Sequence, residues 1–352
     1  MSWVLDTQYI TPEELTPLTR VALGEQQVNA FTLARWLPNV ALDDIVYSYK
    51  KGGEGGLTET AVYRSWDTES RIGRREGVSD VMGELPPISE KIPLNEYDRL
   101  RIRNMDDNDP MRRLIARDAV RLAAKIAARF EVGKGEALAD AQFTIKENGV
   151  DIPPVVFGRK PEHSVTAAIL WTDHADATPL NDLESWVQTY IDTNGGPPDR
   201  MLMPRTVLAD MRQCDQVVRQ VFPLAPAGSA PMVSVDQINT VLAGMDLPPI
   251  EINDARVSVD GVATRIMPAN AIVFVPAPGP TDAAQPTDLG AFLLGTTAEA
   301  LEEDYEAVED RSGIVAATYK TREPIRLWTH AAAVGMPVLR SPNLTFKAVV
   351  RA

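Results

Sequence analysis

The sequence is poor in cysteine, histidine and aromatic residues, and these scarcities narrow the classes of protein that fit it. Cys214 is the single cysteine among 352 residues, so no disulfide can form within the chain and an oxidising compartment is not indicated. No apolar run approaches the roughly 20 residues that a membrane-spanning helix needs. The first residues also lack the basic start and apolar stretch of a signal peptide. We therefore expect a soluble intracellular protein with no membrane partner.

Basic residues are in the minority as well. The chain has 35 Lys and Arg against 49 Asp and Glu, which gives a formal net charge of -14. Tight binding to a phosphate backbone needs a clustered positive surface. The charge balance therefore argues against a protein that binds nucleic acid tightly. It suits a protein that stays soluble and does not adhere to DNA. In contrast, the 27 prolines and 22 glycines indicate many loops and extended segments.

The usual motifs of catalysis and cofactor binding are missing too. We find no phosphate-binding loop, dinucleotide pattern or Gly-x-Ser-x-Gly elbow. "TDHADA" places His174 between Asp173 and Asp176, but no second His-rich segment completes a metal site. Cys214 has no histidine near it in sequence and is expected to be inert inside a helix. We predict no catalytic residue, no cofactor and no metal, and therefore no enzyme.

What the sequence does contain is a long amphipathic helix, "DPMRRLIARDAVRLAAKIAARF", which starts at Asp109. Asp109 suits the N-cap, Pro110 the first turn and Gly133 the end, so we expect a helix over 110–132. Its apolar stripe recurs at spacings of four and three: Met111, Ile115, Ala119, Leu122, Ile126 and Phe130. Beside this stripe runs the basic ladder, which we define as Arg113, Arg117, Arg121, Lys125 and Arg129.

Like charges four residues apart disfavour a helix by a few tenths of a kcal/mol per pair. The ladder is therefore either a solvated face or one that meets carboxylates on this subunit or the next. The acidic run Leu301–Asp310 could bind a cation, but we favour a solvated face or the other half of an interface with the ladder.

Residues 46–105 have too little apolar content to bury a core of their own. "VYSYKKGGEGGLTETAVYRSW" opens with alternation that places Tyr47 and Tyr49 on one side, and glycines follow. The return leg holds prolines that exclude a helix and a central strand, at positions 86, 87 and 93. Such a segment predicts a long hairpin that packs on a neighbour.

Residues 1–45 read as an arm. We expect short helical turns restarted at Pro12 and Pro17. Phe31 and Trp36 lie in "FTLARWLPNV" without a clear period, and they are candidates for docking either on another subunit or on the chain's own core.

The remainder mixes helices and strands without regular alternation, which predicts an α+β fold. Asn148-Gly149 predicts a β-hairpin directly after the long helix. Helices are expected at 178–196 and 205–222, and a capping box is expected from Ser234 to Gln237. Later segments are mainly strands.

This order of elements resembles the major capsid protein of tailed bacteriophages in its lambda-like branch, the major capsid protein E family. Three stretches carry the resemblance: "NDPMRRLIARDAVRLAAKIAARFEVGKGEAL", "RIMPANAIVFVP" and "LWTHAAAVGMPVLRSPNLTFKAVV". They look like the family's spine helix, its strand after a Pro–Asn turn, and its closing segment. The resemblance implies the tailed-phage capsid fold of the Hong Kong ninety-seven type. It also implies an N-terminal arm (1–45), an extended loop (46–105), a peripheral domain (106–177, rejoined by 291–352) and an axial domain (178–290).

The implied function is that of a structural protein of the virion. Such proteins assemble with copies of themselves, as hexamers and pentamers, into an icosahedral shell around packaged double-stranded DNA, without sequence-specific binding. A decoration protein, a scaffold and a portal are expected partners, and the host cytoplasm is the expected place of assembly. The arm, the loop and the ladder would then be inter-subunit contacts, with Phe31, Trp36, Tyr47 and Tyr49 as candidates beside the ladder residues.

Some relatives join subunits through a lysine–asparagine bond, and Lys50 and Lys51 lie in the loop. Nothing in the sequence identifies the acceptor or the acidic catalyst, so we expect no cross-link. Two other functions stay open at this point: a cellular nanocompartment shell of the same fold, and a soluble enzyme with an acidic surface.

Overall fold

The computed structural model describes residues 3–29, 31–51, 60, 63–69, 79–97, 100, 109–147, 149–223, 232–259, 261–280, 285–302 and 312–352. The chain forms two compact units. Unit 1 comprises Met1–Tyr47, Met82–Gly135 and Pro278–Val338, and unit 2 comprises Ser48–Val81, Glu136–Ala277 and Leu339–Ala352. These units cut across the ranges expected from the sequence, so the names peripheral and axial remain predictions. The mixture of helices and strands is α+β, as expected.

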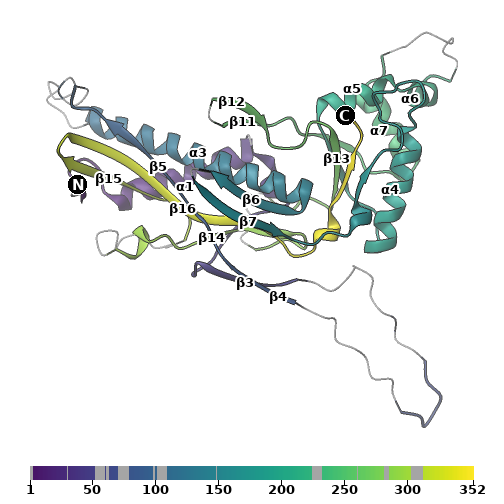
Figure 1. Cartoon of the computed structure of the whole chain (residues 1–352), viewed down its shortest axis with the longest axis horizontal. Coiled ribbons are helices and arrows are strands. Elements are labelled where there is room, and N and C mark those ends of the chain that lie inside the picture. The colour runs from purple at the N-terminus through teal and green to yellow at the C-terminus, as the bar shows by residue number, and fades with distance from the viewer. Residues whose placement is uncertain are drawn as a thin grey trace. The chain divides into compact units, whose positions relative to one another are not determined.

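Unit 1 is built on a mixed sheet with one helical face (Figure 1). Its described strands run in the order β1 (Trp3–Leu5), β15 (Val315–Arg322), β16 (Ile325–Leu339), β14 (Gly290–Gly295) and β2 (Asn39–Ala41). A sixth strand, β5 (Pro87–Leu94), pairs with the other edge of β16, from Leu327 to Val334. A short 3-10 turn, η3 (Glu299–Leu301), follows β14. Within the described residues β5 pairs with β16 alone, so its prolines lie in an edge strand, as predicted.

The long helix α3 (Asp109–Asp140) covers this sheet with the predicted apolar stripe (Figure 1). All six stripe residues are buried, and they pack with β14, β15 and β16 in one cluster. The expected end at Gly133 is wrong, because the helix has 32 residues and continues to Asp140. Arg159 closes it instead: its Nη2 donates to the carbonyl of Ala139 at 2.8 Å. A guanidinium supplied from a later segment thus satisfies the terminal carbonyls, which leaves no local sequence signal.

The first residues form a helix rather than restarted turns. α1 (Pro12–Asn29) contains Pro17 within its length, so the prediction of a break there is wrong. Pro17 removes only one intrahelical donor. Packing offsets that loss: Leu15 is fully buried, and Thr16 Oγ1 both donates to Ala316 O and accepts from Ala316 N on β15. A 3-10 turn, η1 (Thr32–Arg35), leads to β2.

Among the described residues, the hairpin predicted over 46–105 is present only at β3 and β4, because Pro87–Leu94 of its return leg lies in the sheet and core of unit 1. β3 (Val46–Lys51) and β4 (Ser79–Glu84) form a separate two-stranded sheet (Figure 1). The ring of Tyr47 covers Gly83, where an added β-carbon would lie 2.5 Å from the Tyr47 Oη atom. Glycine is therefore required opposite this aromatic ring. The glycine-rich segment 52–59 lies outside the described residues.

Unit 2 has a second mixed sheet with helices beside it (Figure 1). Its described strands run in the order β10 (Ile250–Ile252), β9 (Arg200–Met203), β13 (Ala271–Val275), β17 (Phe346–Val349) and β8 (Ser164–Thr166). Its helices are α4 (Pro179–Asn194), α5 (Arg205–Gln213), α6 (Asp215–Val221) and α7 (Val235–Gly244). Two 3-10 turns, η2 (Pro161–His163) and η5 (Pro342–Leu344), flank its edge. One apolar cluster joins these helices to β9, β13 and β17.

Several local predictions for unit 2 are confirmed. β6 (Gln142–Glu147) and β7 (Val150–Val156) form an antiparallel hairpin, and Gly149 has a φ of 80° in the turn. A second hairpin, which was not predicted from the sequence, joins β11 (Arg256–Val259) to β12 (Val262–Arg265). Gly195 ends α4 in the left-handed conformation. Ser234 and Gln237 form the expected capping box of α7.

The single helix expected over 205–222 is wrong, because it breaks at Cys214 into α5 and α6. Cys214 has a ψ of 128°, which is extended backbone. The next backbone N–H, of Asp215, donates to the carbonyl of His174 at 2.8 Å rather than to the preceding turn. A tertiary hydrogen bond therefore decides where the helix divides.

Candidate assembly surfaces

The basic ladder lies on α3, at the border of the buried stripe. Arg113, Arg117, Arg121 and Lys125 are exposed, whereas Arg129 is half-buried. Lys125 pairs with Glu90 on β5, and Arg121 approaches Asp118 on α3 at 3.5 Å. Both ion pairs have at least one exposed member, so each contributes little to folding.

Asp118 is a buried carboxylate beside this surface, with 7% of its area exposed. Burial raises its pKa, and the positive charges of Arg121 and Arg117 oppose that rise. Arg121 and Arg117 therefore act on a carboxylate of their own helix while their exposed ends face solvent. The ladder is partly neutralised within the subunit, and its outer side stays available.

The aromatic candidates do not share one environment. Trp36 is 1% exposed and Tyr47 is 3% exposed, so both rings are buried by their own unit. Phe31 is half-buried and packs against the unit 1 cluster. We therefore leave Trp36 and Tyr47 out of the proposed contact surface, because their rings are buried among the described residues. The side chain of Tyr49 lies outside the described residues.

Residues 63–69, in contrast, place every side chain in solvent. Tyr63 is 103% exposed and Trp66 is 94% exposed. Sequence reasoning missed both residues as candidates, although "AVYRSW" shows two aromatics three apart in a segment without a core. Tyr and Trp are enriched among the residues that dominate binding at interfaces, so both residues are candidate contacts.

Two buried charged residues on α3 were not indicated by the sequence. Glu131 and Lys134 are 1% and 0% exposed, although their spacing is that of an ordinary surface pair. Glu131 Oε1 accepts from the backbone N–H of Leu33 at 2.9 Å, and Lys134 Nζ lies 5.4 Å from the centre of the Phe292 ring. Burial raises the pKa of Glu131 and lowers the pKa of Lys134, and the mutual attraction of the two charges opposes both shifts.

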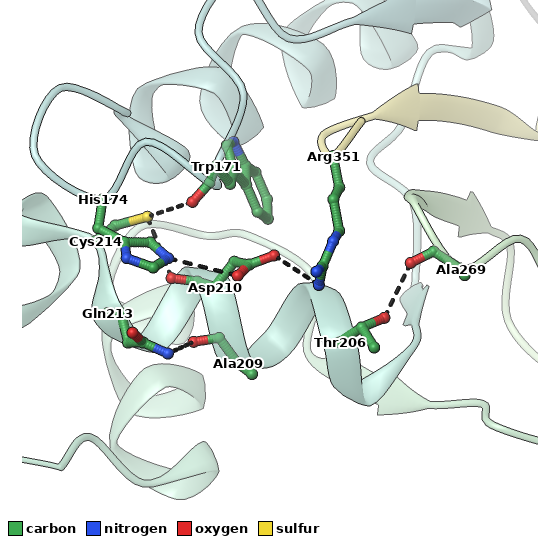
Figure 2. Close-up of polar contacts among 9 residues, drawn as sticks. All are labelled: Trp171, His174, Thr206, Ala209, Asp210, Gln213, Cys214, Ala269 and Arg351. Atoms are coloured by element: carbon green, nitrogen blue, oxygen red, sulfur yellow. Dashed lines mark hydrogen bonds and ion pairs between the residues drawn. The ribbon is translucent and has the colours of Figure 1, made fainter.

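Polar contacts around Asp210 in unit 2 bring together the histidine and the cysteine considered for chemistry (Figure 2). Asp210 Oδ1 lies 3.4 Å from His174 Nε2, and Asp210 Oδ2 accepts from Arg351 at 3.2 Å. Cys214 Sγ donates to the carbonyls of Asp210 and Trp171 at 3.3 and 3.5 Å.

This arrangement disfavours nucleophilic chemistry at the sulfur. Burial, followed by the negative charge of Asp210 and three other aspartates, raises the pKa of Cys214 to about 12. A thiol in that environment stays protonated, and the thiolate is the reactive form. The contacts instead tie α5 to the last residues of the chain through Arg351.

Among the described residues, no three His, Cys, Asp or Glu side chains gather as a metal site would require. Most of the acidic run, 303–310, lies outside that part of the chain. In the same described part, none of the helices combines the length and apolar character needed to cross a bilayer.

The chain is similar to known phage proteins in sequence family and in fold. Residues 52–350 match the family model described as phage major capsid protein E. A putative capsid protein of a prophage from E. coli CFT073 has a similar structure, with a TM-score of 0.62 and 12% identity over 99% of this chain and 100% of that one. A phage-related protein from Bordetella bronchiseptica RB50 gives a TM-score of 0.60 and 14% identity over 99% and 98%.

Among proteins with curated functions, none matches the sequence. The structural likeness establishes the tailed-phage capsid fold, and the family match covers most of the chain. The chain therefore belongs to the phage major capsid protein E family, and it is a structural protein of the capsid shell.

Proposed function

We propose that copies of this chain assemble as hexamers and pentamers into the icosahedral head that encloses phage double-stranded DNA. The observation that carries this proposal is the segment 63–69, in which Trp66 is 94% exposed. A tryptophan left in solvent by its own subunit is typical of the few residues that dominate binding at an interface. We therefore assign a neighbouring copy of the same chain as the binding partner of this exposed segment.

We assign the parts of the chain as the sequence led us to expect. Residues 46–105 serve as the extended loop, 106–177 and 291–352 as the peripheral domain, and 178–290 as the axial domain. In this assignment the exposed side of the ladder, above all Arg117 and Arg121, meets carboxylates of an adjacent subunit. Networks of this kind fix register more than they add stability.

The overall charge fits a container for DNA. A chain with a net charge of -14 repels the phosphate backbone, so packaged DNA stays mobile inside the shell. We accordingly propose enclosure without sequence-specific binding. Shell formation requires no catalytic step from this chain, and we propose none.

A scaffold, a portal and a decoration protein are the proposed partners, with assembly in the host cytoplasm before incorporation into the virion. We propose that the shell forms without covalent cross-links between subunits. Denaturing electrophoresis of purified particles tests this point: a single monomer band agrees with it, and a ladder of multimers contradicts it.

The decisive experiment is negative-stain microscopy of the expressed chain, alone and with the neighbouring head genes. Shells or capsomers are the expected result, and a strictly monomeric protein under both conditions overturns the proposal. The contents of purified particles separate a phage head from a nanocompartment. Nuclease-protected DNA is expected for the head, whereas an enclosed enzyme without DNA is the outcome for the alternative.

A further inference from the structure

Residues 65–68 form a tight turn that presents Trp66 to solvent. The hydroxyl of Thr68 donates to the carbonyl of Ser65 at 2.7 Å, and the Thr68 backbone N–H reaches the same carbonyl at 3.4 Å. Arg64 Nη1 donates to the carbonyl of Thr68 at 2.6 Å. The turn is therefore shaped by its own hydrogen bonds. Docking of its tryptophan costs less ordering entropy than docking of a free chain would.

Unit 1 contains a hollow of about 390 Å³ on its sheet. It is lined by residues of β5, β15 and β16, namely Ser89, Glu90, Lys91, Tyr319 and His330. The Tyr319 and His330 rings meet edge to face, with their centres 5.7 Å apart. A volume in the range of roughly 300–1,000 Å³ accommodates compact organic groups, so the hollow has room for an aromatic side chain.

The hollow opens on the sheet face that α3 does not cover. Ile88 and Ile92 of β5 pack into the cluster under α3. Because side chains alternate along a strand, Ser89 and Lys91 point to the opposite face. The register places Lys91 opposite His330, and the Lys91 ammonium lies 4.9 Å from the centre of the Trp328 ring. The surface thus carries aromatic rings and the Lys91 ammonium, while the carboxylate of Glu90, which also lines the hollow, pairs with Lys125 on α3.

We propose that Trp66 of one subunit docks into this hollow on a neighbouring subunit. The inference rests on the proposed assembly and names the contact that the extended loop makes. Ring edges of Tyr319 and His330 suit the face of an indole. The acidic Asp67 and Glu69, which flank Trp66 and are exposed, complement the ammonium of Lys91. Two surfaces that the described residues of the single chain leave open are completed by the same contact.

Cysteine cross-linking between two differently marked subunits tests the contact. One variant carries Ser65→Cys next to Trp66, and the other carries Ser89→Cys at the hollow, so each change replaces a hydroxyl by a thiol of similar size. The native Cys214 gives little background, because it is fully buried and its pKa is raised. The two variants are co-assembled, oxidised mildly and separated by denaturing electrophoresis.

The expected result is a product that joins the two marked chains. Ser185→Cys, an exposed serine on α4, replaces Ser89→Cys in the matched control and should give no product. Adding Trp66→Ala to the Ser65→Cys chain should lower the yield about tenfold or more, as loss of a central interface tryptophan does. Trp66→Phe should retain most of the yield.

Two results overturn the inference. They are shells without a mixed product and a product formed equally well with Ser185→Cys. Each of these leaves the proposed function standing when microscopy shows shells. Failure of the unmodified chain to form shells or capsomers contradicts the proposed function itself, so the two failures are distinguishable.

Discussion

The Oε1 atom of Glu131 on α3 accepts a hydrogen bond of 2.9 Å from the backbone N–H of Leu33 at the start of η1. A buried carboxylate thus fastens the segment that leads into β2, and Lys134 supplies the compensating charge. Neither charge is reached by solvent, since both side chains are at most 1% exposed. Removal of one member leaves the other buried without its counter-charge.

We therefore expect Glu131→Ala to lower the free energy of unfolding of the isolated subunit by about 3–5 kcal/mol. The double variant Glu131→Gln/Lys134→Met should lie much closer to the unmodified chain, because it removes both charges and keeps an acceptor for Leu33. Urea unfolding followed by circular dichroism measures both. A double variant as unstable as Glu131→Ala contradicts the role assigned to the pair.

Charge reversal on the ladder should impair assembly without unfolding the subunit. Arg117→Glu and Arg121→Glu change exposed side chains but also place a negative charge near the buried Asp118, so we expect a loss in folding stability of about 1 kcal/mol, which leaves the subunit folded. The yield of shells should fall sharply, because each variant places a carboxylate opposite the expected carboxylate of a neighbouring subunit, and the two negative charges repel each other. The charge-neutral Arg117→Gln is the matched control and should assemble better than Arg117→Glu. Particles of normal yield and size from both reversed variants would count against the ladder as a contact.

Gly335 on β16 has no room for a side chain. An added β-carbon would lie 2.6 Å from the carbonyl oxygen of Leu293 and 2.9 Å from Phe292 Cε1. We expect Gly335→Ala to destabilise the subunit by about 1–3 kcal/mol, as overpacking does in other cores.

The control for this variant is a glycine with open space around it. Gly24 lies inside α1, and an added β-carbon there meets nothing within 4 Å. Gly24→Ala should stabilise the subunit by about 0.5–1 kcal/mol, because alanine restricts the unfolded chain. Thermal unfolding of the two variants measures opposite shifts, and shifts of equal sign contradict the packing argument.

His163 makes unit 2 sensitive to acid. Its side chain is fully buried, Nδ1 lies 3.2 Å from the carbonyl of Thr345, and burial lowers its pKa. Below about pH 6.5, the ordinary pKa of histidine, His163 takes up a proton in the unfolded chain but stays neutral in the folded chain. Stability should therefore fall as the pH drops through and below that value.

His163→Asn, which retains a donor for Thr345, should show a smaller loss of stability between pH 7.5 and 5.5 than the unmodified chain. Urea midpoints of the unassembled subunit at the two pH values measure the difference. Equal losses in the two proteins would assign the acid sensitivity to other groups, such as His330, whose pKa burial also lowers.

The sequence was most informative where a pattern is local. The apolar stripe of α3, the turn at Gly149 and the capping box of α7 depend on residues a few positions apart, and each was predicted. The order of elements then allowed the family to be identified, although no single motif is a signature.

The errors have a common physical origin in contacts distant in sequence. α3 passes Gly133 because Arg159 satisfies its last carbonyls, and α1 passes Pro17 because Thr16 bonds Ala316. The carbonyl of His174 divides the helix at Cys214. A single sequence does not show which distant residues will contact one another, so these helix boundaries could not be predicted from it.

The candidate site was predicted only in part. The ladder follows from the spacing of its residues, but burial of Trp36 and Tyr47 could not be foreseen, since aromatics without a period are as common in cores as at interfaces. Glu131 and Lys134 look like any surface pair in the sequence, and only packing against Leu33 and Phe292 distinguishes them.

The sheet of unit 1 joins residues from opposite ends of the sequence. Trp3 pairs with Thr321, and Asn39 pairs with Phe292. Pairings between such distant positions slow folding. During translation these strands have no partner until β14 and β15 leave the ribosome, so a nascent chain cannot present a finished unit 1 to its neighbours. A polypeptide interrupted before β15 lacks the central strands β15 and β16, so we expect that it is not incorporated into a growing particle.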